Sequence, residues 1–129
     1  MTTGMLSWLH QQIEARRALA ESASPGPWTA NAEHDEVLAV DGERVADGFA
    51  LSGNQLRNTV DHIAFNDPRQ IIADCEADLE IADLHGRDAM DACRACGGYF
   101  PCLTLLAVVS RYRHRPGYLP EWAPERITP

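Results

Sequence analysis

Residues 91–102 read D-A-C-R-A-C-G-G-Y-F-P-C. In this stretch Cys93, Cys96 and Cys102 lie on both sides of the glycine pair at 97–98. Two thiols separated by two residues can both reach one ion, and the glycines allow the backbone to turn before the third thiol. The stretch therefore predicts a metal-binding loop, and three cysteines with one histidine form a known class of structural zinc site.

The fourth ligand of such a site has to be a histidine that lies near the loop. His85 is the closest in sequence and is our first choice, while His62 and His114 are the alternatives. The thiols can also be interpreted as three reduced, partly buried side chains, because their spacing is only half of the usual two-pair zinc pattern. Four protein ligands would leave no position for water, so the zinc would be structural rather than catalytic.

The chain has 129 residues, the usual size of one domain, so we predict a single domain over 1–129. Its net charge of −8 is unevenly distributed. Residues 1–92, the predicted body of helices and hairpin, contain 17 acidic and 6 basic side chains. Residues 93–129, the cysteine loop, last helix and tail, contain 2 acidic and 5 basic side chains. An acidic chain is a poor general nucleic-acid binder, because such binding requires positive charge that displaces counterions.

The sequence predicts a cytoplasmic protein. No apolar run approaches the roughly 18 residues of a membrane span, so we expect no membrane partner. The first ten residues, M-T-T-G-M-L-S-W-L-H, lack the basic region of a signal peptide. In the cytoplasm, cysteines bind metal more often than they form disulfides, which agrees with the zinc interpretation.

The first half of the chain predicts a helix followed by a small antiparallel sheet. Apolar residues at helical spacing indicate a helix over Thr3–Glu21, which the prolines and glycine of 22–27 end. Asp41-Gly42 is a strong hairpin signal, and Trp28 is expected to cover one face of the sheet. The strand candidates are Trp28–Asn31, Val37–Val40 and Arg44–Ala46.

The second half predicts three helices and a docked tail. A helix over 51–66 ends at Asp67-Pro68, where Asp67 can cap and Pro68 can begin the next helix, which closes at His85-Gly86. After the cysteine loop, Pro101–Arg113 is predicted as the last helix. The tail, 116–129, is expected to be irregular and to dock through three side chains, Tyr118, Leu119 and Trp122. The predicted fold class is therefore α+β, with a zinc-stapled loop before the final helix.

Other polar groups favour structural interpretations. Cys75 lies on the apolar stripe of the third helix, where a free thiol behaves as a small hydrophobic group. The acidic run 74–83 is typical of a solvated helix face. His62, with Asp61 and Asp67 nearby, has the composition of a base and its orienting acid, yet a hydrogen-bonded surface histidine is more common. No G-x-S-x-G turn and no phosphate-binding loop occurs, so we favour a protein that is not an enzyme.

Four phrases of the sequence together resemble one family. They are S-P-G-P-W at 24–28, H-I-A-x-x-D-P at 62–68, C-x-T-L at 102–105 and Y-x-x-R-P-G-Y-x-x-E-W-A-P at 112–124. The chain resembles an uncharacterised family, a domain of unknown function, of small proteins from actinobacteria and their phages. The resemblance implies a small cytoplasmic accessory protein of phage or prophage origin, and it implies no activity.

We therefore expect a small zinc-stabilised accessory protein that acts as a protein-interaction or regulatory module with a protein partner. One alternative is a small metal-dependent hydrolase with an open metal position near Asp78 or Asp83. Another is a nucleic-acid binder or mimic, which would use either the acidic half or the basic side chains Arg111, Arg113 and Arg115.

Overall fold

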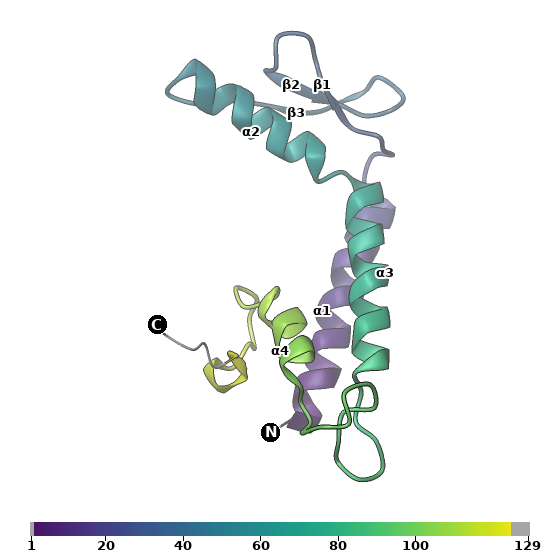
Figure 1. Ribbon diagram of the computed structural model, residues 1–129. Helices are drawn as coiled ribbons and strands as arrows, with labels where there is room; N and C mark the ends of the chain where they lie inside the picture. The colour runs from purple at the N-terminus through teal and green to yellow at the C-terminus, as the bar shows by residue number, and fades with distance from the viewer. Residues whose placement is uncertain (1, 125–129) are drawn as a thin grey trace. The chain divides into compact units, whose positions relative to one another are not determined.

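The structure, a computed structural model, describes residues 2–124. Four α-helices, one three-stranded antiparallel sheet and one short 3-10 helix make this part of the chain α+β, which confirms the predicted fold class (Figure 1). The elements in chain order are α1 (Thr2–Ser22), β1 (Thr29–Ala30), β2 (Glu36–Leu38), β3 (Arg44–Asp47), α2 (Gly53–Phe65), α3 (Pro68–Leu84), α4 (Leu103–Ser110) and η1 (Pro120–Trp122).

The chain forms two compact units. The sheet unit comprises Arg16–Asp74, and the helical unit comprises Met1–Ala15 together with Cys75–Pro129. The boundary between them falls inside α1 and inside α3, and it does not coincide with the change of charge near residue 92. Whether the chain behaves as one domain stays a prediction.

The sheet unit contains the predicted antiparallel meander, in the order β1-β2-β3. The Asp41-Gly42 hairpin signal is confirmed, because the Gly42 N–H donates to the carbonyl of Ala39 (2.9 Å) between β2 and β3. Val37 and Ala39 are buried, as is Val60 of α2, and α2 packs against β1 and β2. The alternating apolar residues of the sheet thus form a small core with one helix.

The junction between α2 and α3 follows the predicted capping. One carboxylate oxygen of Asp67 accepts a hydrogen bond from the Gln70 N–H (3.0 Å), the bond of a helix N-cap, and Pro68 begins α3. The other oxygen accepts from the Trp28 N–H (3.1 Å), and Arg69 lies 3.4 Å away. Asp67 therefore joins the start of α3 to the segment that leads into β1.

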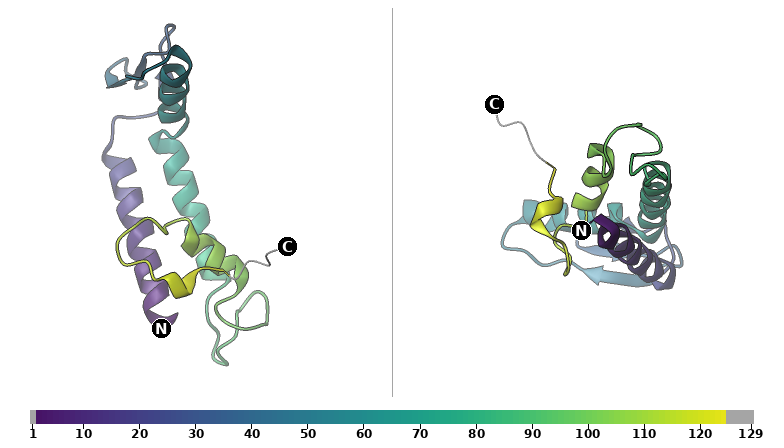
Figure 2. Two further views of the ribbon diagram at one scale, coloured as in Figure 1. Left: turned by 90° about the vertical axis from the view of Figure 1, so that its left-hand side faces the viewer. Right: turned by 90° about the horizontal axis from the view of Figure 1, so that it is seen from below.

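The helical unit has an apolar core shared by three helices. In Figures 1 and 2, α4 lies beside the N-terminal part of α1 and the C-terminal part of α3. Met5, Leu9 and Ile13 of α1 recur at helical spacing and are fully buried, as are Leu105 and Val109 of α4. Cys75 of α3 is also buried, as expected for a cysteine on an apolar stripe.

The last helix is shorter than predicted. It runs from Leu103 to Ser110 and not from Pro101 to Arg113, because Cys102 caps its start and the chain tightens at its end. Beyond Ser110 the N–H groups of Tyr112 and Arg113 donate to carbonyls three residues back, as in 3-10 turns.

The tail docks mainly through two aromatic rings. Tyr118 and Trp122 lie 5.9 and 5.2 Å from the ring of Trp8 in α1. The Trp8 indole N–H also donates to the Pro116 carbonyl (3.0 Å). Leu119, which we expected to dock, is 37% exposed, and the tail contains the short helix η1 where we predicted irregular structure.

The acidic face of α3 is a second point of difference. Asp78 was predicted on a solvated face, yet it is fully buried. Its Oδ2 accepts a hydrogen bond from the Tyr112 hydroxyl (2.8 Å), and its Oδ1 lies 3.5 Å from the Arg111 guanidinium. Asp78 lies three residues after Cys75 and four before Ala82, both buried, so it shares the inner face of the helix.

Among the described residues, none of the helices combines the length and the apolar character that a membrane crossing requires.

Candidate metal centre

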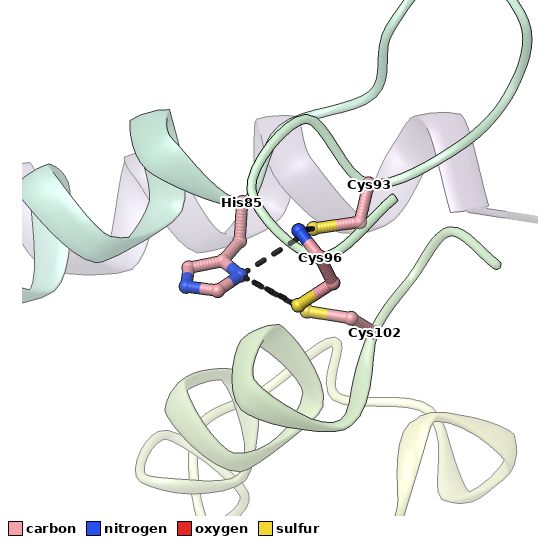
Figure 3. Close-up of side chains that lie close together, drawn as sticks. All are labelled: His85, Cys93, Cys96 and Cys102. Carbon is pink, nitrogen blue, oxygen red and sulfur yellow. Dashed lines mark hydrogen bonds between the residues drawn. The ribbon is translucent and has the colours of Figure 1, made fainter. Parts of the chain in front are cut away.

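Four side chains from three places in the helical unit converge on one point. His85 directly follows α3, Cys93 and Cys96 belong to the loop that comes next, and Cys102 is the residue before α4 (Figure 3). One potential ligand atom of each lies within 4.8 Å of the others. The four cysteines of the chain are all free thiols. The structure therefore brings together the residues that the sequence predicted as ligands.

The distances fit a single tetrahedral ion. Nδ1 of His85 lies 3.4 Å from the Cys93 sulfur, 3.5 Å from that of Cys96 and 3.3 Å from that of Cys102. A tetrahedral zinc ion, with Zn–S near 2.3 Å and Zn–N near 2.0 Å, would separate nitrogen and sulfur ligands by about 3.5 Å. The three separations agree with this value, and they identify Nδ1 as the ring nitrogen that faces the sulfurs.

The backbone holds the first two sulfurs in a tight turn. The Gly97 N–H donates to the Cys93 carbonyl (2.8 Å), and the Cys96 N–H approaches the Cys93 sulfur at 3.4 Å. Gly97 has φ of +74°, in the left-handed region where a side chain costs energy. The glycine after Cys96 is thus what allows the chain to close around Cys93.

The third sulfur is held by a helix. The Cys102 sulfur accepts from the Leu105 N–H (3.4 Å), as a serine hydroxyl would at an N-cap. The positive end of the helix dipole at this position favours a negatively charged sulfur. The Cys102 sulfur thus caps the first turn of α4 and also faces the other three side chains of the cluster.

Short backbone bridges join the loop to the end of α3. Arg87 pairs with Cys93, and Ala92 pairs with Tyr99. Arg94 donates its N–H to the Gly86 carbonyl (2.9 Å), and its guanidinium covers Gly86, where a Cβ would lie 2.5 Å from Nη2. Gly86 lies two residues after the end of α3, where the sequence predicted that the helix closes. It does not adopt a positive φ, and its lack of a side chain leaves room for the Arg94 guanidinium.

The thiols do not all ionise readily in the absence of a cation. Burial opposes ionisation of Cys93, but hydrogen bonds from the Cys96 N–H and from His85 outweigh it and lower the pKa of Cys93 to about 6. The hydrogen bond between Cys96 and Cys93, followed by burial, raises the pKa of Cys96 to about 11. A divalent cation deprotonates the thiols that coordinate it, so the cluster is better suited to a bound ion than to three free thiolates.

Other candidates from the sequence lie outside this cluster. His62 contacts Asn66 of its own helix end (3.5 Å), and His114 is exposed after α4. Neither belongs to the group of donors that surrounds the three sulfurs. Asp61 and Asp67, suggested as orienting acids for His62, are bonded to other residues. Asp61 contacts His34 (2.7 Å) across the sheet unit, a pairing that sequence spacing did not indicate.

The fold and the cluster define a class of protein: a small α+β chain with three cysteines and one histidine gathered at a helix–loop–helix junction. The chain belongs to a family of unknown function, DUF6221, whose profile matches residues 2–124, and this confirms the resemblance to an uncharacterised family. The comparisons with curated proteins and with solved structures gave no match.

Proposed function

We propose that this chain is a zinc-stabilised module that binds a partner protein, with His85, Cys93, Cys96 and Cys102 as the zinc ligands. The observation that carries the metal part is the position of His85 Nδ1, 3.3–3.5 Å from all three sulfurs. Thiolate ligands select soft or borderline ions such as zinc over magnesium or calcium, which prefer oxygen.

The proposed role of the ion is structural. Four protein donors complete a tetrahedral site and leave no position for the water that a hydrolytic metal centre activates. The ligands come from the end of α3, the loop and the start of α4, so a bound ion would join the two helices. Besides the sulfur contacts, the loop is ordered by isolated bridges, by backbone bonds and by the Asp88 carboxylate, which accepts from the N–H groups of Met90 (2.8 Å) and Ala92 (2.9 Å). Because the ion would bind four side chains of this segment at once, we expect it to add to this stability.

The proposed interaction role is supported by large apolar side chains that the fold leaves in solvent. In the cysteine loop, Tyr99 is 95% exposed and Met90 is 84% exposed. Phe49 and Leu51 of the sheet unit are 86% and 102% exposed. Exposed aromatic and long apolar side chains near one another are typical of surfaces that a partner covers.

The basic side chains after α4 give the nucleic-acid alternative less support. Arg111 lies against buried Asp78, and the Arg113 guanidinium donates to the Ser110 carbonyl (3.2 Å). Two of the three arginines considered for phosphate contacts thus have partners within the helical unit.

Metal content and cobalt spectroscopy test the zinc site. Protein purified without chelator should contain one zinc per chain by native mass spectrometry. Replacement of zinc by cobalt should give the visible bands of a tetrahedral ion and the near-ultraviolet bands of sulfur ligands. Cys96→Ser should reduce both signals strongly, whereas the matched variant Cys75→Ala removes a thiol outside the cluster and should retain them. Wild-type protein without metal, or equal loss in both variants, would refute the site.

A further inference from the structure

The strand β3 forms a free edge of the three-stranded sheet. Because the strand order is β1-β2-β3, β3 pairs with β2 alone and is an edge strand. The helix α2 packs chiefly on β1 and β2. At four residues, β3 is also longer than the other edge strand, β1, which has two.

The backbone pairing shows which groups of β3 face away from β2. The Gly48 N–H donates to the Asp35 carbonyl (2.8 Å), and Ala46 is the register partner of Val37. Since alternate residues of an antiparallel strand direct their backbone groups to the same neighbour, Asp47, which lies between Ala46 and Gly48, directs its N–H and C=O groups to the free edge. The register shifts between Val37 and Leu38, opposite Val45, so the alternation is interrupted at that residue. Such an edge is a template for another strand.

Two large apolar side chains follow this edge directly. Phe49 is 86% exposed and Leu51 is 102% exposed, and they lie two and four residues beyond the end of β3. Exposed residues at this spacing could contact alternate side chains of an added strand, which is how strand addition gives specificity. Burial in a complex would remove their apolar area from water.

The charge of this region indicates the kind of strand that it accepts. Residues 28–52 contain six acidic side chains and one basic side chain, Arg44. Arg44 is already paired with Glu36 (3.1 Å) and Asp47 (3.5 Å), so it does not offset the carboxylates of Asp41 and Glu43. Edge-to-edge pairing of two copies would bring these carboxylates together, whereas a basic segment would neutralise them.

We propose that the free edge of β3 binds an extended, basic segment of a partner protein, which adds to the sheet as a fourth strand. Backbone bonds to Asp47 would hold the segment, Phe49 and Leu51 would contact its apolar side chains, and Asp41 and Glu43 would attract its basic ones. The inference rests on the proposed interaction role and is independent of the zinc site.

The direct test is an NMR titration of the ¹⁵N-labelled full chain with three synthetic peptides. One alternates valine and lysine, the second alternates valine and glutamate, and the third carries proline at the central positions of the lysine peptide. The lysine peptide should shift the amide signals of Val45, Asp47 and Phe49, and the other two should not. Equal shifts with the glutamate peptide, shifts confined to other regions, no shifts, or concentration-dependent dimerisation through β3 would each overturn the proposal.

Two variants sharpen this test. Asp47→Pro removes one outward N–H at a position where an edge strand tolerates proline. It should lower the affinity for the lysine peptide at least tenfold. If that variant loses the sheet by circular dichroism, the double variant Asp41→Arg with Glu43→Arg decides the question. This double variant should bind the lysine peptide more weakly and the glutamate peptide more tightly than wild type does. Glu14→Arg in α1 should leave the affinity for both peptides unchanged. Unaltered peptide preference in the double variant would refute the charge argument.

The outcome for the zinc site is separate. Zinc-bound protein that ignores all three peptides would retain the metal centre and reject the β3 edge. Binding of the lysine peptide by wild-type protein that holds no zinc would support the β3 edge and reject the metal centre.

Discussion

The Tyr112 hydroxyl donates a 2.8 Å hydrogen bond to Oδ2 of Asp78, a carboxylate that is fully buried in the helical unit. Arg111, the neighbour of Tyr112, lies 3.5 Å from the other oxygen. Two residues that follow α4 therefore contact the Asp78 carboxylate on the inner face of α3, so the turn after α4 is joined to α3 by polar contacts.

Tyr112→Phe should destabilise the chain by about 1–3 kcal/mol, because it leaves a buried carboxylate oxygen without its donor while removing little apolar area. Urea denaturation followed by circular dichroism measures the difference. Tyr99→Phe makes the same chemical change at a side chain that is 95% exposed, and should alter stability by less than about 0.5 kcal/mol. Equal effects of the two variants would show that the contact with Asp78 contributes nothing.

Gly117→Ala should loosen the tail. Gly117 has φ of +93°, and a Cβ there would lie 2.6 Å from the Trp8 indole nitrogen. The backbone strain of alanine at this φ and the close contact with Trp8 together should lower the free energy of unfolding by about 1–3 kcal/mol. Hydrogen exchange should increase near Trp122, and the thermal midpoint should fall. Gly4→Ala, at a helical position with open space, should leave stability equal or higher, and a larger loss there than at Gly117 would contradict the prediction.

Asp67 should make the sheet unit sensitive to acid. Burial opposes its ionisation, but hydrogen bonds from the N–H groups of Gln70 and Trp28, with Arg69 nearby, outweigh burial and lower the pKa of Asp67 below 3.8. Because the folded pKa is depressed, the stabilisation is present above the unfolded pKa and is lost as the pH falls through the folded pKa.

Asp67→Asn therefore tests this pH dependence. The variant should be less stable than wild type at pH 6, and the difference should shrink below about pH 4. Unfolding curves from pH 2 to 7 measure this, and Glu33→Gln, at an exposed position in the same unit, serves as the control. A difference that stays constant over the whole pH range would argue against the charged cap.

Histidine variants test which residue completes the metal site. His85→Ala should lower zinc affinity by more than the roughly 10–100-fold typical of losing a hydrogen-bond partner of a ligand, because it removes a proposed ligand itself. His62→Ala and His114→Ala should retain wild-type affinity. Competition with a chromophoric chelator measures all three, and wild-type affinity in His85→Ala would assign the fourth position elsewhere.

The features that could be predicted from the sequence are the local ones. Asp41-Gly42 forms its turn and Asp67-Pro68 begins its helix through bonds between residues at most three apart, so short patterns identify them. The cysteine spacing likewise predicted the cluster, and the structure has the three sulfurs close to His85. The two local contacts do not depend on the packing of distant elements, whereas the cluster also spans the 17 residues between His85 and Cys102.

The features that the sequence did not show are non-local. The burial of Asp78 depends on Tyr112, 34 residues away, and an acidic residue among other acidic residues is typical of a solvated face. Its spacing from Cys75 was the available signal, since the two share one face of α3. The contact of His34 with Asp61 depends on how a sheet loop meets α2, which no local pattern encodes.

The double use of Cys102 has an evolutionary consequence. Serine is among the best N-cap residues, so Cys102→Ser would keep the start of α4 while it removes one of the four metal donors. A single nucleotide change can thus separate the two roles of this residue, because it keeps the helix cap while it removes one sulfur from the cluster. Under the proposed zinc site, family members with serine at this position should retain the start of α4 and bind the ion more weakly.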